Sequence, residues 1–489
     1  MVQIFCFISI TLLFLDFTGS VHAYLGWVAK MQFIPAIFAS HVIIALAIVF
    51  LTLLFGRFYC SMLCPLGIFQ DIVSFKTRFS YKKPRKGFVI LRYVLLAGFI
   101  ATAFAGGGLI SVLEPYSAFG RIVSQIFGPI YKFGNNLLAY FAERAGSYAF
   151  YSVDVWVKSL TSFVLAILTL VGVSIFAYKS GRGYCNTVCP VGTFLGLLSK
   201  YSFMKYRIDL SKCKHCDLCV KSCRASCIDT KEGKIDYSRC ITCEKCVKAC
   251  PSKAISYSKS SSYSKPSKKS MQKETEILSE SGTQRRNLFA GSAIAALSSA
   301  VKLRASQGDG GLTNLIDKKV PNRKTPIVPP GAGSFKHFHD HCLGCQLCAS
   351  VCPNDVLSNK AHGTTKPNMS YERGYCRPEC VKCSEVCPTG AIKPILRSEK
   401  SSIQIGCAVW NKELCIVNKD KVACDLCSRK CPNAAITMIP QSADAAPDVP
   451  KIPMIDTERC IGCGACEHLC PARPHSAIVV EGIEVHRTI

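Results

Sequence analysis

The sequence predicts an α-helical membrane domain with four helices, and a candidate fifth, joined to small cysteine-rich domains of the α+β class. Three observations lead to this fold class. Apolar runs that could cross a bilayer lie before residue 200 of the 489-residue chain. Most of the 31 cysteines follow later, in rows of regular spacing. Two further cysteine pairs lie in a short word that occurs twice within the apolar part.

Four apolar runs predict the membrane helices. The runs Phe33 to Phe55, Gly87 to Gly106 and Ser159 to Tyr178 each reach the roughly 20 residues that an α-helix needs to span hydrocarbon. The fourth, Met1 to about Phe17, is shorter. We interpret it as a first membrane helix and not as a signal peptide, because no basic residue precedes Lys30. Residues 1–200 are therefore predicted to form a four-helix membrane domain.

Basic residues indicate the orientation of these helices. The formal net charge is +27, but Lys and Arg follow the apolar runs and are not interleaved with aromatic residues, which argues against a nucleic-acid partner. Seven of them lie between Lys76 and Arg92, whereas residues 106–157 hold only three. By the positive-inside rule the first stretch faces the cytoplasm and the second faces outward.

Three segments follow the membrane domain. Residues 201–255 carry two cysteine rows, residues 256–324 form a Ser- and Lys-rich linker, and residues 325–489 carry four rows. The linker contains Arg285-Arg286 ahead of a modest apolar run, Leu288 to Val301, which is the pattern of an internal twin-arginine (Tat) export signal. Export would make this run a fifth crossing and place residues 325–489 outside. The alternative is a short amphipathic or buried helix.

The cysteine rows predict six [4Fe-4S] clusters in ferredoxin-like domains. Thiolates are soft ligands suited to iron–sulfur centres, and in two-cluster ferredoxins the fourth cysteine of one row binds the cluster of the other row. Applied to three pairs of rows, this rule gives six ligand sets. They are Cys213, Cys216, Cys219 and Cys250 (set 1); Cys240, Cys243, Cys246 and Cys223 (set 2); Cys342, Cys345, Cys348 and Cys387 (set 3); Cys376, Cys380, Cys383 and Cys352 (set 4); Cys415, Cys424, Cys427 and Cys470 (set 5); and Cys460, Cys463, Cys466 and Cys431 (set 6).

Some spacings depart from the usual row. Arg224 follows Cys223 where proline is usual. The first two cysteines of set 4 are separated by one residue more than in C-x-x-C. A longer loop separates the first two cysteines of set 5. Zinc also takes all-cysteine sites, but it does not require the third and fourth cysteines at these spacings followed by proline. No C-x-x-C is followed by His, which excludes covalent c-type haem.

Three cysteines belong to no set. Cys6, Cys227 and Cys407 are expected to pack as small hydrophobic residues, although Cys227 could compete with Cys223 as a ligand. The histidines of "HFHDH", residues 337–341, are expected to be solvated or to support a neighbouring ligand, and not to form a separate metal site.

The repeated words "GRFYCSMLCPLG" (56–67) and "GRGYCNTVCPVG" (181–192) hold Cys60 and Cys64, and Cys185 and Cys189. Both words follow an apolar run and are expected on the cytoplasmic side. Their duplication implies a pseudo-twofold arrangement in which four thiols converge. Converging thiolates would hold a seventh cluster or another metal, whereas two separate pairs would be redox-active dithiols. Structural or lipidated cysteines explain neither the proline nor the duplication.

The words, the four apolar runs and the two-row segment resemble NapH-type membrane iron–sulfur proteins. The segment from "TPIVPPGAGSF" through the four last rows resembles NapG-type four-cluster proteins, whose twin-arginine leader matches "QRRNLF". The chain is thus similar to a fusion of the two. The resemblance implies a quinol dehydrogenase component of a bacterial inner membrane, which takes electrons from the quinone pool and passes them to a periplasmic reductase or other electron acceptor.

Candidates for a quinol site are few. Asp16 and His41 are ionisable groups within apolar runs, and Glu114 lies near the outer end of the third run. For each, a hydrogen-bonded structural role is the alternative. Two other functions stay open: a redox maturation or regulatory factor for a metalloenzyme, and a relay that takes electrons from a cytoplasmic ferredoxin.

Replacing Arg285 and Arg286 by lysine is expected to keep the C-terminal domain in the cytoplasm, because the arginine pair is the feature that the export route recognises. Protease protection of a C-terminal tag in spheroplasts measures this. The tag should be accessible in the parent protein and protected in the variant. A tag protected in both would place all six clusters in the cytoplasm and contradict an external acceptor.

Overall fold

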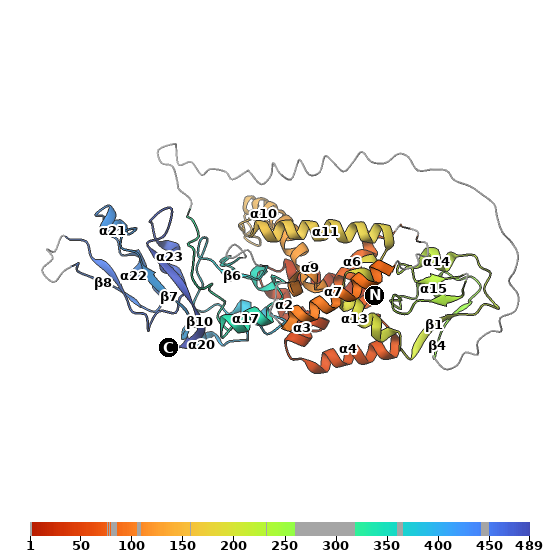
Figure 1. The fold of residues 1–489 in the computed structure, drawn as a ribbon. Coiled ribbons are helices and arrows are strands. Elements are labelled where there is room, and N and C mark those ends of the chain that lie inside the picture. The colour runs from red at the N-terminus through yellow and green to blue at the C-terminus, as the bar shows by residue number, and fades with distance from the viewer. Residues whose placement is uncertain are drawn as a thin grey trace. The chain divides into compact units, whose positions relative to one another are not determined.

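This computed structural model describes residues 2–75, 77, 79, 86–104, 109–156, 158–230, 232–259, 318–358, 365–441 and 449–489. The linker with Arg285, Arg286 and the run Leu288 to Val301 lies outside the described residues, so the predicted export signal and fifth helix stay predictions. The described chain has a helical part, a first cysteine module and a C-terminal cysteine domain (Figure 1).

The helical part contains more helices than the four expected. They are α1 (Val2–Leu15), α2 (Ser20–Lys30), α3 (Phe33–Phe38), α4 (Val42–Phe55), α5 (Phe58–Met62), α6 (Pro65–Val73), α7 (Lys86–Phe104), α8 (Leu109–Leu113), α9 (Pro115–Ile122), the π-helical turn η1 (Val123–Phe127), α10 (Gly128–Arg144), α11 (Leu160–Ser180), α12 (Gly183–Thr187) and α13 (Pro190–Ser199).

The predicted single helix from Phe33 to Phe55 is wrong, because the chain turns between α3 and α4. Ser40 has a left-handed backbone with φ 58°, and the His41 amide closes the turn by donating to the Ala36 carbonyl at 2.9 Å. A residue in this conformation ends an α-helix. Hydropathy does not detect such a turn, since the flanking residues are equally apolar.

Only one described helix, α11, is long and apolar enough to cross a membrane by length and composition. Four shorter apolar helices also occur among the described residues: Val2–Leu15, Val42–Phe55, Phe88–Ala103 and Pro190–Ser199. The run Ser159 to Tyr178 therefore forms a helix close to its expected bounds, whereas a domain of four spanning helices stays a prediction.

The two repeated words fold into the same structure. Each follows a long helix, α4 or α11, which ends at a glycine with positive φ: Gly56 at 81° and Gly181 at 61°. A short helix with the first cysteine follows, and the second cysteine is the N-cap of the next helix, with Pro65 or Pro190 at its start. Proline suits this position because its fixed φ matches a helix and its missing N–H has no intrahelical partner there. The shared Gly, Cys and Pro positions thus have a common structural cause.

Helix α9 is the centre of the helical part. All eight of its residues are buried, and it packs against α6, α8 and α11 (Figure 1). Its N-cap is Glu114, whose carboxylate accepts hydrogen bonds from the Tyr116 amide at 3.0 Å and from the Ser117 amide.

The first cysteine module is closed by an antiparallel pair of strands. Its elements are β1 (Met204–Ile208), α14 (Leu218–Ser222), β2 (Ile228–Asp229), β3 (Lys234–Ile235), α15 (Lys245–Lys248) and β4 (Ile255–Lys259). β1 pairs with β4, with Met204 opposite Lys259, and β2 pairs with β3. The module therefore extends four residues beyond the predicted boundary at 255.

The C-terminal domain repeats this pattern of short helices and two-stranded antiparallel sheets. Its elements are α17 (Phe335–His341), α18 (Leu347–Ser350), β5 (Leu357–Ser358), β6 (Asn368–Met369), α19 (Lys382–Val386), α20 (Arg397–Lys400), β7 (Ile403–Trp410), α21 (Ile416–Lys419), α22 (Leu426–Arg429), β8 (Ile436–Ile439), β9 (Ile452–Ile455), α23 (Ala465–Leu469) and β10 (Ile478–Thr488). The pairs are β5–β6, β7–β10 and β8–β9. The domain begins before the predicted residue 325, since the buried Arg323 forms an ion pair with Glu467 at 2.5 Å.

Replacing Gly181 by alanine is expected to loosen the first module from the helical part. The glycine has a positive φ, and an added Cβ would lie 2.2 Å from the Arg224 carbonyl oxygen. The backbone strain alone costs about 2 kcal/mol. Limited proteolysis after residue 200 and the thermal unfolding temperature measure the effect. Gly172→Ala in the middle of α11 is the matched control, because nothing lies within 4 Å of its added Cβ. Equal behaviour of the two variants would contradict a tight contact at Gly181.

Candidate metal centres

In five of the six predicted sets the structure places all four cysteines within electrostatic range of one thiol of the set, and in set 1 it places three of the four. In the first module, Cys219 lies within electrostatic range of two other thiols of set 1, while the remaining member, Cys216, is exposed. For sets 2 to 6, one thiol of each set has the other three within range; these central thiols are Cys246, Cys348, Cys383, Cys427 and Cys466. The exchange of the fourth cysteine between paired rows is therefore compatible with the fold of each pair. Ligation itself stays a prediction.

The rows fold around their cysteines through left-handed backbone positions. The second cysteine of four rows is flanked on both sides by residues of positive φ, which are His215 and Asp217, Thr242 and Glu244, Gly344 and Gln346, and Gly462 and Gly464. Alternation of right- and left-handed residues turns successive amides toward one concave side, which favours a negatively charged group. Most of these residues are not glycine, so their residue type does not predict a positive φ. Their place on either side of the second cysteine of a row does.

Several amides donate directly to cysteine sulfurs. Ala408 N donates to Cys460 Sγ at 3.4 Å, and Ala435 N and Ala477 N donate to the sulfurs of Cys431 and Cys470 at 3.3 Å. Such N–H groups stabilise thiolates and help to set the potential of an iron–sulfur cluster. The donors and the thiols together fit [4Fe-4S] clusters.

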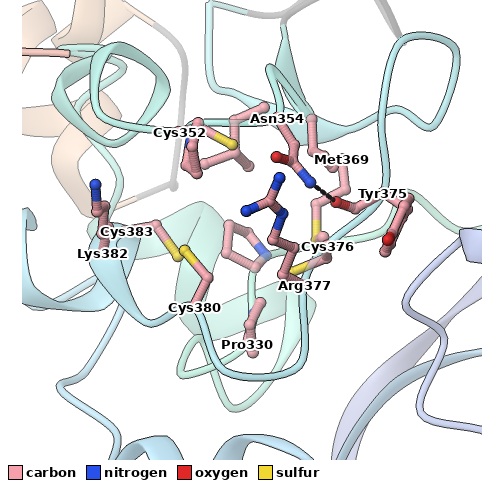
Figure 2. Close-up of a pocket in the computed structure, with 14 residues that line it drawn as sticks. Pro330, Cys352, Asn354, Met369, Tyr375, Cys376, Arg377, Cys380, Lys382 and Cys383 are labelled. Atoms are coloured by element: carbon pink, nitrogen blue, oxygen red, sulfur yellow. Dashed lines mark hydrogen bonds between the residues drawn. The ribbon is translucent and has the colours of Figure 1, made fainter. Parts of the chain in front are cut away.

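Three sets line cavities. Figure 2 shows Cys352, Cys376, Cys380 and Cys383 of set 4 around a cavity of about 420 Å³, with Asn354 held by a 2.7 Å hydrogen bond to the Tyr375 carbonyl. Sets 2 and 6 line cavities of about 350 and 310 Å³. Within the described residues, no three His, Cys, Asp or Glu side chains form a group that could hold a metal ion as a single site, and this includes the rows themselves. A [4Fe-4S] cluster distributes its four thiolates over a larger group of atoms.

Cys227 lies inside the set 2 site, which sequence reasoning considered only as an alternative. Its Sγ is 3.6 Å from Cys223 Sγ, its side chain is 2% exposed, and it lines the same cavity. Cys227 lies four residues after Cys223, the last cysteine of its row. In two other rows this position is an alanine: Ala254 after Cys250 and Ala391 after Cys387. Set 2 therefore has five thiols for four ligand positions.

Arg224, the residue that replaces proline after Cys223, connects the first module to the helical part. Its guanidinium forms an ion pair with Asp71 of α6 at 2.8 Å, and its carbonyl accepts a hydrogen bond from the Arg182 amide at 2.8 Å. Burial alone would raise the pKa of the Asp71 carboxyl, but Arg182 and Arg224 hold this pKa below its usual value. The departure from the usual row thus has a structural reason.

The four cysteines of the repeated words converge. Cys60, Cys64, Cys185 and Cys189 are each at most 4% exposed, and each lies within electrostatic range of others of the four. We name them the central thiol cluster. The sequence left two arrangements open, four converging thiols or two separate pairs. The observed positions agree with four converging thiols.

Each sulfur of the central thiol cluster has an N–H donor. Gln70 Nε2 donates to Cys185 Sγ at 3.1 Å and Gly192 N to Cys189 Sγ at 3.3 Å. Gly67 N is the corresponding donor to Cys64, and the Arg57 guanidinium lies 3.7 Å from Cys60 Sγ. Neutral thiols packed as hydrophobic residues do not need such donors, whereas metal-bound thiolates do.

Two fully buried arginines cross between the words. Arg57 of the first word donates to Asn186 Oδ1 at 2.8 Å and to the Cys185 carbonyl at 3.3 Å. Arg182 of the second word donates to the Cys60 carbonyl and binds Asp71 at 2.7 and 2.9 Å. An added Cβ at Gly67 or Gly192 would lie 2.6 or 2.9 Å from the crossing arginine. The arginines and glycines shared by the words thus lock the two copies together.

The central thiol cluster lies between set 2 and set 3. On one side, Cys240 and Cys243 of set 2 are within electrostatic range of Arg57 and Arg182. On the other side lies α9, whose Gly120 leaves room for the Cys345 carbonyl: an added Cβ would be 2.8 Å from that oxygen.

Tyr116 of α9 also faces set 3. It is fully buried within range of Cys345 and Cys387, and its hydroxyl has no hydrogen-bond partner. A hydroxyl in this position could donate to a sulfur of the cluster. Only three-dimensional structure reveals this residue, since it belongs to no motif.

The ionisable residues singled out in the apolar runs have structural surroundings. Asp16 accepts hydrogen bonds from the amides of Thr18, Gly19 and His22 at 2.8 to 3.1 Å and stabilises the turn after α1. Glu114 caps α9, and His41 is an exposed residue before α4. The structure does not bring these three residues into one site.

The remaining cysteines and histidines belong to no set, although Cys407 lies within electrostatic range of Cys460 of set 6. Cys6 is buried in α1, and Cys407 is half-buried in β7. In α17, His341 contacts Phe38 of the helical part, and His337 Nε2 donates a hydrogen bond to the Gly390 carbonyl at 3.1 Å.

Family models match the cysteine segments of the chain. A 4Fe-4S binding domain matches residues 38–84 and 161–210, which contain both words and hence the central thiol cluster. Other 4Fe-4S binding domains match residues 210–229, 234–256 and 336–358, and a 4Fe-4S dicluster domain matches residues 422–473. Several 4Fe-4S sites are thereby supported, without fixing their number.

Curated relatives are ferredoxin-type proteins. The methylamine utilization ferredoxin-type protein MauM of Methylophilus methylotrophus is 30% identical over 162 residues, which are 32% of this chain and 71% of the relative. The ferredoxin-type protein NapF of Escherichia coli K12 is 30% identical over 161 residues, 33% of this chain and 87% of the relative. NapG of the same strain is 30% identical over 154 residues, 29% and 65% of the two chains. No solved structure matches.

Protein purified without oxygen is expected to contain about 24 iron atoms per chain from six [4Fe-4S] clusters, and more if the central thiol cluster is also loaded. Iron and acid-labile sulfide analysis of the full chain measures this. About half that content, or stoichiometric zinc, would contradict the assignment of the sets.

Proposed function

The chain belongs to the ferredoxin-type 4Fe-4S proteins, and from this premise we propose that it takes electrons from quinol in a membrane and passes them through its clusters to a reductase outside the membrane. It is an iron–sulfur electron-transfer protein related to the Nap and Mau carriers. Quinol as donor, the membrane and the external reductase are the parts that we propose. They agree with the resemblance to a fusion of NapH-type and NapG-type proteins.

The observation that carries the proposal is the continuous order of thiol groups. Set 1 and set 2 share the first module, and the central thiol cluster lies beside set 2. Set 3 follows across α9, and Cys348 of set 3 lies within range of Cys383 of set 4. Iron–sulfur clusters exchange single electrons, so their spacing within one protein decides where electrons go. An iron–sulfur cluster held by the central thiol cluster would connect the first module with the C-terminal domain. Without it, only helices would lie between these two parts.

Exposed apolar side chains support a membrane location. Large hydrophobic residues that are at least half exposed lie along α1, α4, α7 and α11: Ile4, Phe5, Ile8, Ile43, Leu46, Phe50, Ile90, Val94, Leu160, Leu168 and Ile175. Soluble proteins rarely expose apolar residues along several neighbouring helices. A lipid environment would cover these faces.

The ends of α11 support a position of the two cysteine parts on opposite sides of that membrane. Before its first turn, Lys158 forms an ion pair with Asp355 of the C-terminal domain at 2.9 Å. After its last turn, Arg182 N donates to Arg224 O of the first module. Twenty-one helical residues are about 31 Å long, which is close to the thickness of the hydrocarbon core.

Oxidation of quinol to quinone releases two electrons and two protons. The cysteine sets would hold [4Fe-4S] clusters, which supply one-electron chemistry. The protons leave to solvent, and the electrons reduce the external acceptor. The chain's residues position the clusters and exclude water from them, and the N–H donors at the sulfurs tune their potentials.

A second donor is favoured by one observation, the exposure of Cys216 in set 1. A cluster at this edge could receive electrons directly from a cytoplasmic ferredoxin. The electrons would then follow the same order of thiols to the external side. Anaerobic titration of the holoprotein with quinol and with reduced ferredoxin, monitored by paramagnetic resonance, separates the two donors.

Replacing Cys60 and Cys185 by serine is expected to interrupt electron transfer between the two cysteine parts. The six sets supply their own ligands, so the loss of iron should not exceed about four atoms, the content of one cluster. After a pulse of quinol, sets 1 and 2 should no longer reach the same degree of reduction as sets 3 to 6.

The matched control is Cys6→Ala, which removes a buried cysteine of α1 that belongs to no set. It should leave both iron content and electron distribution unchanged. Equilibration of all clusters at the parental rate in the Cys60→Ser, Cys185→Ser protein would contradict a relay through the central thiol cluster.

A further inference from the structure

A pocket that contains no cysteine lies where the helical part contacts set 3. Its volume is about 500 Å³ with the open solvent at its mouth included, and it is lined by the end of α1, by η1 and the start of α10, by Trp156 and Lys158, and by α18 with its N-cap Gln346. We propose that this pocket binds the headgroup of a quinol. The inference deepens the proposed function and rests on it for the identity of the ligand.

Two buried polar groups in the pocket lack partners. Gln125 Nε2 donates to Gln346 Oε1, which leaves Gln346 Nε2 without a hydrogen bond although this side chain is only 2% exposed. The hydroxyl of Ser124 is also buried and unpaired. A buried polar group without a partner costs free energy unless a ligand or water satisfies it. The oxygens of a quinol or quinone headgroup are suitable partners for an amide N–H and a hydroxyl.

The other walls suit a flat and neutral ring. Phe14, Phe17 and Trp156 contribute aromatic surface. Two lysines line the pocket, but Lys158 is already paired with Asp355 at 2.9 Å and donates to the Ala349 carbonyl. Lys132 forms no ion pair among the described residues, and the carboxylates of Asp154 and Asp355 lie within electrostatic range and offset part of its charge. A phosphate of a lipid headgroup would favour two available cations, so the composition favours a quinol.

The pocket is adjacent to a one-electron acceptor. Gln346 lies between Cys345 and Cys348 of set 3 in the chain, and Ala349 and Ser350 of the same short helix also line the pocket. A cluster in set 3 would accept the first electron and pass it to set 4 before it accepts the second. Both protons would leave to solvent.

A path for the apolar tail begins at the rim. Gly128 and Pro129 line the pocket, and the residues around them on η1 and α10 expose large apolar side chains: Phe127 is 42% exposed, Ile130 63% and Tyr131 48%. A quinol tail could lie along this surface toward the lipid. Sites for amphipathic ligands commonly combine such an apolar entrance with a few polar groups at the closed end.

The test uses the detergent-solubilised full-length holoprotein and two variants, Ser124→Ala and Gln346→Asn. Asparagine withdraws the amide but tolerates the left-handed backbone of residue 346, where φ is 68°. A short-tailed azidoquinone should label η1, α10 or residues 346–350 on illumination, and unlabelled quinone should compete. Each variant should raise the KM for a short-tailed quinol about tenfold with unchanged iron content, because one buried hydrogen bond is lost.

Trp27→Phe is the control, since Trp27 is an exposed aromatic residue of α2 that does not line the pocket; its KM should equal that of the parent. Labelling elsewhere, with quinol still reducing the clusters, would overturn the pocket and leave the proposed function intact. Failure of quinol to reduce the parental protein would overturn the proposed function. Displacement of the label by anionic phospholipid vesicles, but not by quinone, would identify a lipid site and overturn the inference.

Discussion

Arg57 of the first word hydrogen-bonds the second word, and Arg182 of the second word hydrogen-bonds the first. The rest of the structure depends on this reciprocal interaction. Both guanidinium groups are fully buried, and each binds the carbonyl of the first cysteine in the other word. Removal of one partner from a buried charged pair costs more than the pair contributes, because the remaining charge is left without compensation. Each word therefore stabilises the fold of the other, and the four thiols converge only when both words are present.

The same arginines also fix the first module. Arg57 donates to the Ser238 carbonyl at 3.0 Å, and Asp71 joins Arg182 to Arg224. One buried network thus aligns the central thiol cluster with set 2. The positive guanidinium groups would favour the reduced, more negative state of a cluster bound there, whereas Asp71 offsets part of this effect.

The cysteine sets could be written from the sequence because a row is a local pattern. Cysteines three and four positions apart can reach one cluster through short turns, and which four thiols hold each cluster stays a prediction. Convergence of Cys60, Cys64, Cys185 and Cys189 was predicted as one of two alternatives, since duplication suggests symmetry without deciding distance. The prediction of one helix from Phe33 to Phe55 was wrong because hydropathy averages over the turn at Ser40. The pocket near Gln346 could not be predicted, because its walls come from parts of the chain that are more than 300 residues apart, such as Phe14 and Ala349.

The contact between the helical part and the C-terminal domain is only partly polar: buried apolar residues of both parts belong to one continuous hydrophobic core, and α1 packs against α18. Ser111 bonds Thr365, Gln125 bonds Gln346, Trp156 and Lys158 bind Asp355, and Lys382 donates to the Thr18 carbonyl. The polar groups of these surfaces can be hydrated before the two parts meet, whereas the apolar groups stay exposed to water until then. The order of biogenesis follows from this property: the C-terminal domain can acquire its clusters before it docks, because sets 3 to 6 use its own cysteines, and burial of the apolar groups then drives docking. Assembly of the protein would then resemble the association of two subunits that share one chain.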